Sequence, residues 1–468
     1  MNVLRKILFI TIIFFTTVLP SCIDDGFTDS SSATLTFSSD TVNFGTVFTD
    51  LTTPTARLLV FNRNNKGVKI SSIRLQNPDT PFRMNVDGVS GSSFSDVEIR
   101  GNDSIYVFLE CFLESTDSNI PQLTSDRLEF VTNGVTQTVE IEAWGWNVTR
   151  LKSFTITEDT RFTAERPYVI FDTLTINRGA TLNIDPGAWL LFHDKASLLV
   201  KGTFIAQGEA GNMIRMSGDR LDDVLFETPY DLLAGQWGGI IIDRESFDNR
   251  MEYVNMRSTV YGLRVDSCGD LSRSKLVIKN SWLHNSQGNV LRSAHAAVDA
   301  FGCCFSEAAG AVVNLAGGIH NFVQCTIANA YLFSSLYEPN LVLEHCLPED
   351  NAEAGTPLMD ASFENCIVWG DIGSSIEPGD LTGSNVFMRN VLFKADGSDD
   401  ANFINCLWNQ NPLYFTVRAD YLFDYRLQPD SPAIGAGNPL YVTEETLYDM
   451  DGNYRLAFGN PSLGAYAN

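Results

Sequence analysis

A cysteine returns at nearly the same place in a short repeat through the C-terminal half of the chain, and this repeat constrains the fold most. The repeating positions are Ser281, Cys303, Cys325, Cys346 and Cys366. They are 22, 22, 21 and 20 residues apart, and Cys406 follows in a similar sequence. Such a short period among strand-forming segments is typical of a solenoid, whose coils each bury a face against their neighbours.

The same repeat predicts the state of the cysteines. Equivalent side chains on successive coils stack about 4.8 Å apart and point in one direction, which is poor disulfide geometry. We therefore expect the repeating cysteines to be small, buried core residues. Cys303 and Cys304 should lie on opposite faces of one strand, and the sequence has no Cys-x-x-Cys pair that would indicate a metal site.

The N-terminus predicts export. Arg5 and Lys6 precede an apolar stretch over residues 7–19, shorter than the ~20 residues that a membrane span requires. Residues 19–22, Leu-Pro-Ser-Cys, resemble the lipobox of bacterial lipoproteins. The resemblance implies a signal peptide over 1–21 and a lipid on Cys22 that anchors the chain to a membrane. An ordinary signal peptide with an incidental cysteine is the alternative.

The segment after Cys22 predicts the cellular location of the protein. Ile23-Asp24-Asp25 is similar to the surface-export signal of Bacteroidetes lipoproteins, which implies an outer-membrane and surface location. Residues 22–33 are then the lipidated cysteine and a flexible tether. The net charge of −25, from 32 basic and 57 acidic residues, repels phosphate backbones, so we expect no nucleic-acid partner.

Residues 34–148 predict a β-sandwich. They contain about eight short alternating segments, and Asn133-Gly134 between two of them is a hairpin signal. Residues 44–47, residues 59–62 and the last segment, 139–145, resemble the immunoglobulin-like domains of the ASPM/SPD-2/hydin type. That resemblance implies a spacer or docking module without catalysis.

From residue 150 the pattern changes to short strands separated by corners that contain Gly, Asn or Asp-Pro-Gly. Residues 174–192 and 236–242 resemble coils of right-handed parallel β-helices of the pectate-lyase-like superfold, and 312–330 resembles a coil of Bacteroidetes β-helical lipoproteins. The expected fold is therefore all-β, an immunoglobulin-like sandwich followed by a right-handed parallel β-helix over 150–468. About 12 to 14 coils of ~22 residues would fit.

The C-terminal segment is expected to close the solenoid. Residues 431–437, 449–455 and 464–466 resemble the closing segment of exported β-helix proteins, with Gly435 in place of the usual Asp. An open end of parallel strands is an aggregation edge, so we expect a cap from about residue 413.

The sequence offers little catalytic chemistry. Parallel β-helices are often polysaccharide lyases or glycoside hydrolases, whose carboxylates should recur at the coil spacing on one outer face. No such series is present, and we assign no catalytic residue. His284, His320 and His345 are interpreted as separate surface or corner residues. The asparagines beside the repeat are expected to stack from coil to coil; they are Asn280, Asn365, Asn390 and Asn405.

One acidic, aromatic segment, residues 219–231, interrupts the coil pattern. Its carboxylates could bind Ca²⁺, the one cofactor that the sequence suggests, and its aromatic side chains could stack on sugar rings. A solvated loop that covers one side of the solenoid is the alternative. The candidate residues are Asp219, Asp222, Asp223, Phe226, Glu227 and Tyr230.

Three functions remain open from the sequence. The first is a non-catalytic, lipid-anchored surface protein whose β-helix binds polysaccharide or another surface protein. The second is a polysaccharide lyase or glycoside hydrolase with a site on the outer face of the helix, because such sites are assembled in space and not in sequence. The third is a structural component of the envelope.

Overall fold

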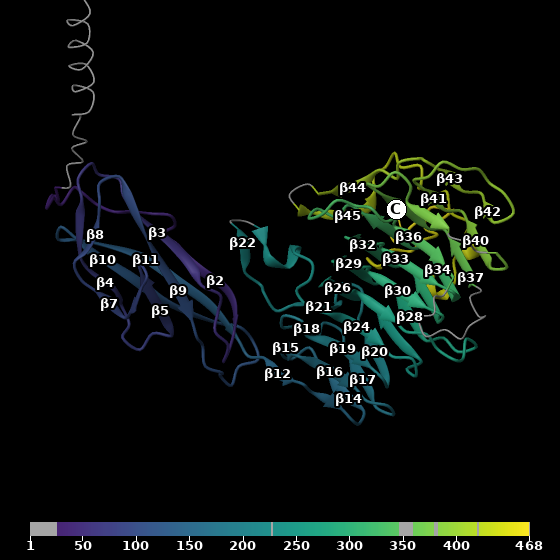
Figure 1. The fold of residues 1–468 in the computed structure, drawn as a ribbon, viewed down its shortest axis with the longest axis horizontal. Coiled ribbons are helices and arrows are strands. Elements are labelled where there is room, and N and C mark those ends of the chain that lie inside the picture. The colour runs from purple at the N-terminus through teal and green to yellow at the C-terminus, as the bar shows by residue number, and fades with distance from the viewer. Residues whose placement is uncertain (1–25, 226–227, 346–358, 379–381, 419–420, 468) are drawn as a thin grey trace, which may run out of the picture. The chain divides into compact units, whose positions relative to one another are not determined.

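The chain folds into two compact all-β units, Met1–Trp146 and Asn147–Asn468 (Figure 1). The structure is a computed structural model that describes residues 26–225, 228–345, 359–378, 382–418 and 421–467. Within these ranges no helix has the length and apolar character needed to cross a membrane. Cys22 lies outside the described residues, so its lipidation stays a prediction.

The N-terminal unit consists of two sheets around one hydrophobic core. The five-stranded sheet contains, in spatial order, β1 (Thr36–Phe37), β3 (Ala56–Asn62), β9 (Asp103–Cys111), β5 (Phe82–Val86) and β6 (Val89–Gly91). The six-stranded sheet contains β2 (Thr41–Phe48), β11 (Val135–Trp146), β10 (Gln122–Thr132), β4 (Val68–Leu75) and β7 (Ser93–Phe94), with β8 (Val97–Ile99) also paired to β4.

Alternation of apolar and polar residues builds this unit. Alternate residues of β9 and β10 are buried, and Val107, Leu109 and Phe130 from the two sheets share the core. The predicted hairpin is confirmed: β10 pairs with β11 across Asn133 and Gly134, whose φ angles of 51° and 78° give the turn that matches strand twist.

The second unit is a parallel solenoid of three sheets, and every coil except the last ones adds one strand to each sheet. The first sheet contains β12 (Thr149–Lys152), β15 (Tyr168–Phe171), β18 (Trp189–Phe192), β21 (Ile214–Gly218), β26 (Val254–Thr259), β29 (Trp282–Ser286), β32 (Cys304–Ala308), β35 (Thr326–Asn329), β38 (Ile367–Gly370), β41 (Leu392–Phe393) and β43 (Leu407–Trp408). The second contains β13 (Thr155–Ile156), β16 (Thr173–Ile176), β19 (Ser197–Val200), β24 (Gly239–Ile242), β27 (Leu263–Val265), β30 (Leu291–Ala294), β33 (Val313–Ala316), β36 (Leu341–Glu344) and β39 (Ile376–Pro378). The third contains β14 (Thr160–Phe162), β17 (Thr181–Ile184), β20 (Thr203–Gln207), β25 (Asn249–Glu252), β28 (Leu276–Lys279), β31 (Ala297–Phe301), β34 (Gly318–Val323), β37 (Met359–Glu364), β40 (Asn385–Arg389) and β42 (Phe403–Ile404).

The coil count is lower than the repeat predicted. The first sheet has 11 strands among the described residues, where the sequence suggested 12 to 14 coils. Insertions account for the difference, because they lengthen several coils beyond the basic period. The coil between Cys325 and Cys366, for example, is 41 residues long.

The cysteine stack is present, with two corrections. Cys406 was expected to be buried in the core but is only partly buried, because it lies on the last coil of the first sheet. Cys303, Cys325, Cys366 and Cys406 each lie directly before a strand of the first sheet, and all four are free. The Cys325 amide donates to the Cys366 sulfur at 3.4 Å, so these two are on successive coils. The placement of Cys346 in the stack was wrong, since β35 pairs directly with β38. Cys346 itself lies outside the described residues.

The asparagines beside the cysteines turn the corner between the third and first sheets. Their φ angles lie between 43° and 54°, in the left-handed region that asparagine tolerates better than most residues. The prediction that their amides bond from coil to coil was wrong for Asn390. Asn365 does reach the preceding coil, where the Gln324 side-chain oxygen accepts from its Nδ2 at 3.1 Å in the amide orientation that satisfies both groups. Both asparagines also bond to a later segment of the chain. Asn365 Nδ2 donates to the Asn438 carbonyl at 3.0 Å, and Asn390 Nδ2 donates to the Ala436 carbonyl at 3.1 Å.

Those bonds belong to the C-terminal strap, defined here as residues 413–418 and 421–467. It contains β44 (Tyr414–Val417), β45 (Phe423–Leu427), η4 (Pro439–Tyr441) and η5 (Glu444–Thr446). We expected this segment to cap the open end of the solenoid. The strap instead runs along the side of the solenoid. Tyr425 and Ala465 pack on outward-facing Cys304, and Leu463 packs on Ile367. The outer face of the first sheet is apolar here because the strap covers it.

Candidate functional site

The acidic segment singled out in the sequence forms an insertion between β21 and β24. It contains β22 (Asp223–Leu225), β23 (Thr228–Pro229) and η1 (Tyr230–Leu232). Arg220 donates two hydrogen bonds of 2.6 Å to the Asp222 carboxylate and lies 4.1 Å from the Tyr230 ring centroid. Asp222 and Tyr230 therefore lie close together, but both contact the Arg220 guanidinium of the same chain.

The other acidic residues of the insertion do not converge with them. Asp219 lies 2.7 Å from His193 Nδ1, and its pKa is raised because burial outweighs that contact. Asp231 pairs with Arg257 at 3.2 Å, and its carbonyl accepts from Ser258. Asp223 is exposed on β22. Phe226 and Glu227 lie outside the described residues, and the described part of the chain has no group of three potential metal ligands.

A different polar cluster lies on the outer face of the first sheet, under the strap. We name it the Glu307 cluster: His284 on β29, Ser306 and Glu307 on β32, Tyr414 on β44 and Tyr425 on β45. His284 and Ser306 are direct neighbours in the register. Glu307 is 3% exposed and has a φ of 51°, a conformation that non-glycine residues adopt only when their surroundings hold them.

Two hydroxyl groups hold the Glu307 carboxyl. Ser306 Oγ donates to its Oε2 at 2.6 Å, and the Tyr425 hydroxyl from the strap bonds to its Oε1. His284 Nδ1 lies 3.8 Å from Oε2, and Trp282 stacks on the imidazole at 4.0 Å between ring centroids. The Trp282 indole donates to Ser306 Oγ at 2.8 Å. The Glu307 carboxyl therefore contacts side chains from three strands, β29, β32 and β45.

Burial controls the charge of this cluster. It raises the pKa of Glu307 to about 7, although the two hydroxyls and the charge of Arg257 act in the opposite direction. Burial, and then the charge of Arg257, hold the pKa of His284 well below its ordinary value. The imidazole is therefore neutral near pH 7 and does not neutralise the carboxylate.

The surface interpretation of two histidines was wrong. His284 is buried under the strap, and His320 faces the interior of the solenoid in register with Val298. Its Nε2 donates to the Gly317 carbonyl at 2.7 Å, and burial lowers its pKa to about 4. His345 is half-buried. Sequence reasoning missed the Glu307 cluster because Glu307 and Tyr425 are 118 residues apart.

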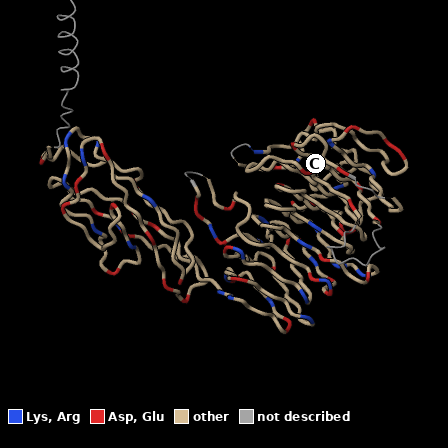
Figure 2. The backbone as a smooth tube through the Cα atoms, viewed as in Figure 1, with Lys and Arg blue, Asp and Glu red and all other residues tan. Residues whose placement is uncertain are grey.

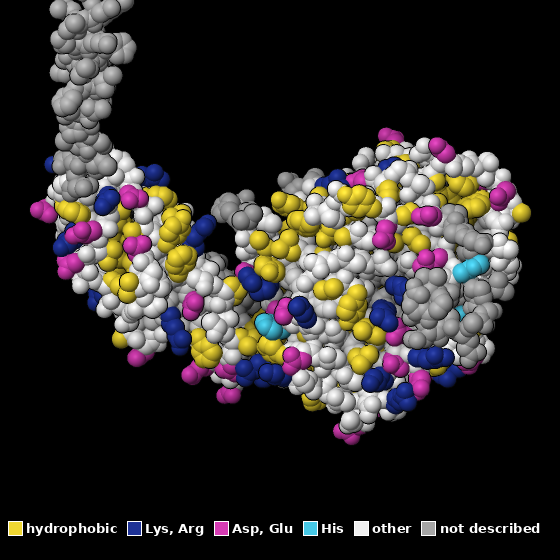
Figure 3. Space-filling view, viewed as in Figure 1, with side chains coloured by type: hydrophobic (Ala, Val, Ile, Leu, Met, Phe, Trp, Pro, Cys, Tyr) yellow, Lys and Arg dark blue, Asp and Glu magenta, His cyan; other side chains and the backbone are white. Residues whose placement is uncertain are grey.

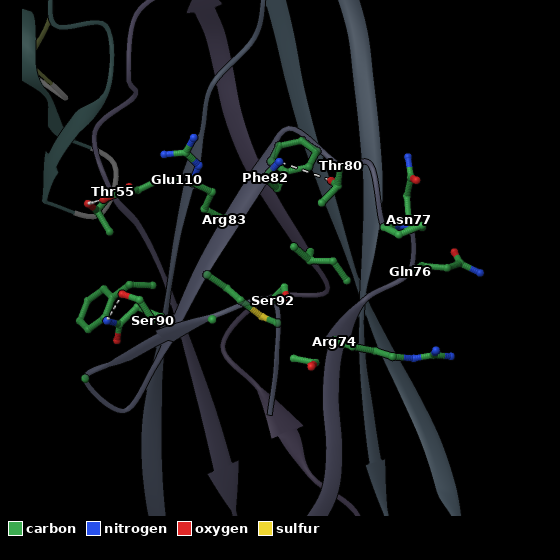
Figure 4. Close-up of a pocket in the computed structure, with 18 residues that line it drawn as sticks. Thr55, Arg74, Gln76, Asn77, Thr80, Phe82, Arg83, Ser90, Ser92 and Glu110 are labelled. Atoms are coloured by element: carbon green, nitrogen blue, oxygen red, sulfur yellow. Dashed lines mark hydrogen bonds between the residues drawn. The ribbon is translucent and has the colours of Figure 1, made fainter. Parts of the chain in front are cut away.

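The N-terminal unit contains an open pocket with a volume of about 1200 Å³ (Figure 4). One side comes from the end of β4 and β7, and the other from β5, β6 and β9. Its polar lining consists mainly of amide and hydroxyl groups, from Thr55, Gln76, Asn77, Thr80, Asn85, Ser90, Ser92 and Ser93. Its apolar lining consists of Leu75, Phe82, Met84 and Phe108, with Pro78 at the rim.

Several polar groups of this pocket are not used by the protein. Among the described residues, Gln76 and Ser92 make no side-chain hydrogen bond, and Arg83 makes no ion pair although Glu110 lies opposite it in the register. Glu110 instead accepts from Thr55 at 3.2 Å. Sequence reasoning missed this pocket, although the Gly/Ser-rich stretch over 88–95 marks the crossing between the sheets that forms one wall.

Basic and acidic residues are interleaved along the coils (Figure 2). Hydrophobic side chains gather over the region that carries the strap (Figure 3). Phe415 and Leu422 of the strap are 64% and 62% exposed.

No family model and no curated protein matches this chain. A family 123 glycoside hydrolase from Clostridium perfringens is similar over 25% of this chain and 30% of its own, at 9% identity and a TM-score of 0.18. A protein of unknown function from Porphyromonas gingivalis W83 is similar over 26% and 59%, at 11% identity and 0.19. The Agl-KA catalytic domain is similar over 76% and 79%, at 9% identity and 0.24. At these TM-scores, none of the three carries an argument about fold or function.

Proposed function

We propose that this chain is an exported lipoprotein, held at the outer membrane through Cys22, that binds a glycan without cleaving it. Its N-terminal unit would be an immunoglobulin-like domain of the ASPM/SPD-2/hydin type, and its solenoid a right-handed β-helix. The pocket of the N-terminal unit would be the glycan site.

The observation that carries this proposal is the chemistry of the pocket. Ligand sites are concave, mostly apolar and supplied with a few convergent polar groups. Here amides and hydroxyls surround an apolar lining, and the Gln76 and Ser92 side chains make no bond within the described chain. Sugars present the complementary pattern of hydroxyl groups at the ring edge and C–H groups on the ring face.

The solenoid supports a binding role over a catalytic one. Glycoside hydrolysis uses two carboxyl groups, one on each side of the scissile bond. The described groups that bond to Glu307 are hydroxyls, from Ser306 and Tyr425. In the insertion, Asp222, Asp231 and Asp219 are paired with Arg220, Arg257 and His193 respectively. We therefore assign these groups to the stability of the fold.

The test is a glycan array with the soluble chain from Gly26 onward, which keeps the pairing of Phe27 with Gly67. Ser92→Trp should fill the pocket and abolish binding, because Ser92 is exposed, lines the pocket and bonds to no described residue. Ser95→Trp is the matched control, since Ser95 is exposed in the same loop outside the pocket. Equal binding by both variants would remove the pocket from the proposal.

Two further measurements address the rest of the proposal. Incubation of each bound glycan with the protein should release no shorter product, and release would move the function to the lyase or hydrolase alternative. Metabolic labelling with palmitate should mark the full-length chain and not Cys22→Ser. An unlabelled full-length chain would contradict the lipid anchor.

A further inference from the structure

A buried carboxyl of the solenoid bonds to the hairpin formed by β44 and β45. Tyr425 is 2% exposed, and its hydroxyl bonds to Glu307 on the outer face of the first sheet. Tyr414, from the other strand of the hairpin, packs edge-on against Tyr425 at 4.9 Å between ring centroids. Its own hydroxyl is buried without a partner among the described residues.

No neighbouring group supplies a full counter-charge to Glu307. His284 of β29 faces it at 3.8 Å, but burial favours the neutral imidazole. Arg257 of β26 contributes a weak favourable field and is paired with Asp231. The remaining titratable groups that face Glu307 are neutral when protonated. They are Cys304 of β32, Tyr414 of β44 and Tyr425 of β45.

The hairpin has weaker attachments than the rest of the strap. Arg418, at its tip, bonds to the Ala330 carbonyl at 3.0 Å and pairs with Asp371, and both side chains of that pair are more than two-fifths exposed. Exposed ion pairs contribute little to stability. The later part of the strap is held to the solenoid by buried bonds instead: the Ala465 amide donates to Thr326 Oγ1 at 2.9 Å, and the Gly464 amide donates to the Asn365 carbonyl at 2.8 Å.

We propose that the β44–β45 hairpin is a pH-sensitive latch, closed on the first sheet while Glu307 is protonated and released as Glu307 ionises. Opening moves the carboxyl from a buried site into water, where its charge is solvated. The remainder of the strap stays in place, so the change is local to the hairpin and exposes His284, Trp282 and Ser306.

The direction follows from proton binding. In the open hairpin Glu307 is exposed and ionises near its ordinary pKa of 4.5, whereas burial raises the pKa to about 7 in the closed state. The closed state therefore binds the proton more tightly. The free energy that holds the hairpin closed is fully present below the ordinary pKa and declines as pH rises through the closed-state value. Between about pH 6 and pH 8 the factor that Glu307 contributes to the opening equilibrium constant should rise about tenfold. His284 acts in the opposite direction, because burial lowers its pKa in the closed state and opening exposes it, so the Glu307 factor has to be measured against a variant that keeps His284.

Amide hydrogen exchange of β44 and β45, measured over this pH range in the soluble chain, tests the proposal. Glu307→Gln keeps the size of the side chain and cannot ionise, so the wild-type rate divided by the variant rate at each pH removes the intrinsic pH dependence of exchange. This ratio should rise about tenfold between about pH 6 and pH 8. A ratio that stays constant would overturn the latch.

A matched control keeps the result specific to the hairpin. Asp299 is another carboxyl whose pKa burial raises, but it lies on β31 of the third sheet and bonds to Ser274. Asp299→Asn should leave the pH profile of the hairpin unchanged, and loss of the profile in this variant would contradict a latch at Glu307. If Glu307→Gln does not fold, the wild-type hairpin is compared with β10 and β11 of the N-terminal unit in the same sample. Equal pH dependence of both regions would then contradict the latch.

Discussion

Burial sets the charge of two basic side chains inside the solenoid. Lys275 is fully buried, and its Nζ donates to the Asp243 and Arg244 carbonyls at 2.7 and 3.0 Å. Burial lowers its pKa to about 8, so the backbone carbonyls only partly replace the lost water. His320 is satisfied on one side only. Its Nε2 donates to the Gly317 carbonyl, but its buried Nδ1 has no partner among the described residues. Both residues make the folded state bind protons less tightly than the unfolded chain.

His320 gives a prediction about acid sensitivity. Its pKa falls from 6.5 to about 4 on folding, so its favourable contribution is present above pH 6.5 and is lost as pH falls toward 4. The solenoid should lose up to ~3 kcal/mol of unfolding free energy over this interval. His320→Gln keeps a donor for the Gly317 carbonyl and cannot titrate. Urea unfolding at both ends of the interval should show a smaller loss in this variant, and an equal loss would contradict the assignment to His320.

At the scale of the element, several coils turn from the third sheet to the first through an asparagine with a positive φ angle. Asn365 and Asn405 occupy equivalent corners with φ angles of 54° and 53°. Only Asn365 also bonds to the strap, where its Oδ1 accepts from the Asn438 amide at 2.8 Å and its Nδ2 donates to the Asn438 carbonyl. Equivalent residues in the repeat therefore do different work, because the strap reaches only some coils.

Glycine substitutions can separate the two roles of these asparagines. Glycine adopts positive φ without strain, so Asn365→Gly removes the two bonds to Asn438 and keeps the turn. We expect a loss of ~1–3 kcal/mol in the unfolding free energy of the solenoid. Asn405→Gly, which loses no bond to the strap among the described residues, should change stability by less. Chemical unfolding of both variants is the measurement, and equal losses would show that the strap bonds contribute nothing.

The sequence predicted the features that depend on regular spacing along the chain. It did not predict the contacts between residues far apart in the sequence. The repeat predicted the parallel coils because paired strands lie at a nearly constant distance along the sequence. The strands that follow Cys303 and Cys325, for example, pair with each other. The repeat failed at Cys346, where an insertion broke the period. The Glu307 cluster and the strap could not be predicted, because Tyr425 and Asn438 contact coils 118 and 73 residues away without a local pattern. The N-terminal pocket combines loops whose relation is set only by packing.

For the whole molecule, the strap is the element that finishes the solenoid surface. It covers outward-facing apolar side chains on several strands of the first sheet, which we call the apolar row although they are not all in one register: Cys304, Ala328, Ile367 and Leu392. The first sheet is consequently buried on both faces through its middle coils. The polar side chains on its outer face there, such as Glu307 and Thr326, are buried and bond to the strap instead of to water.

Removal of the strap should therefore destabilise the solenoid and make it aggregate. A chain that ends at Pro412 would expose the apolar row, and such a patch on a sheet promotes association. We expect earlier thermal unfolding of the solenoid and a higher apparent mass in size-exclusion chromatography. Leu440→Ala is the control, because this strap residue is 85% exposed and should have little effect. A truncated chain that stays monomeric with an unchanged transition would contradict the role given to the strap.

The position of the strap also bears on the order in which the chain can mature. Synthesis proceeds from the N-terminus, so every coil can form before the residues that seal their flank have left the ribosome. Ala465, in the last described part of the strap, bonds through its amide to Thr326 in the middle of the solenoid. A nascent chain must therefore shield that flank by other means until the strap has emerged and docked.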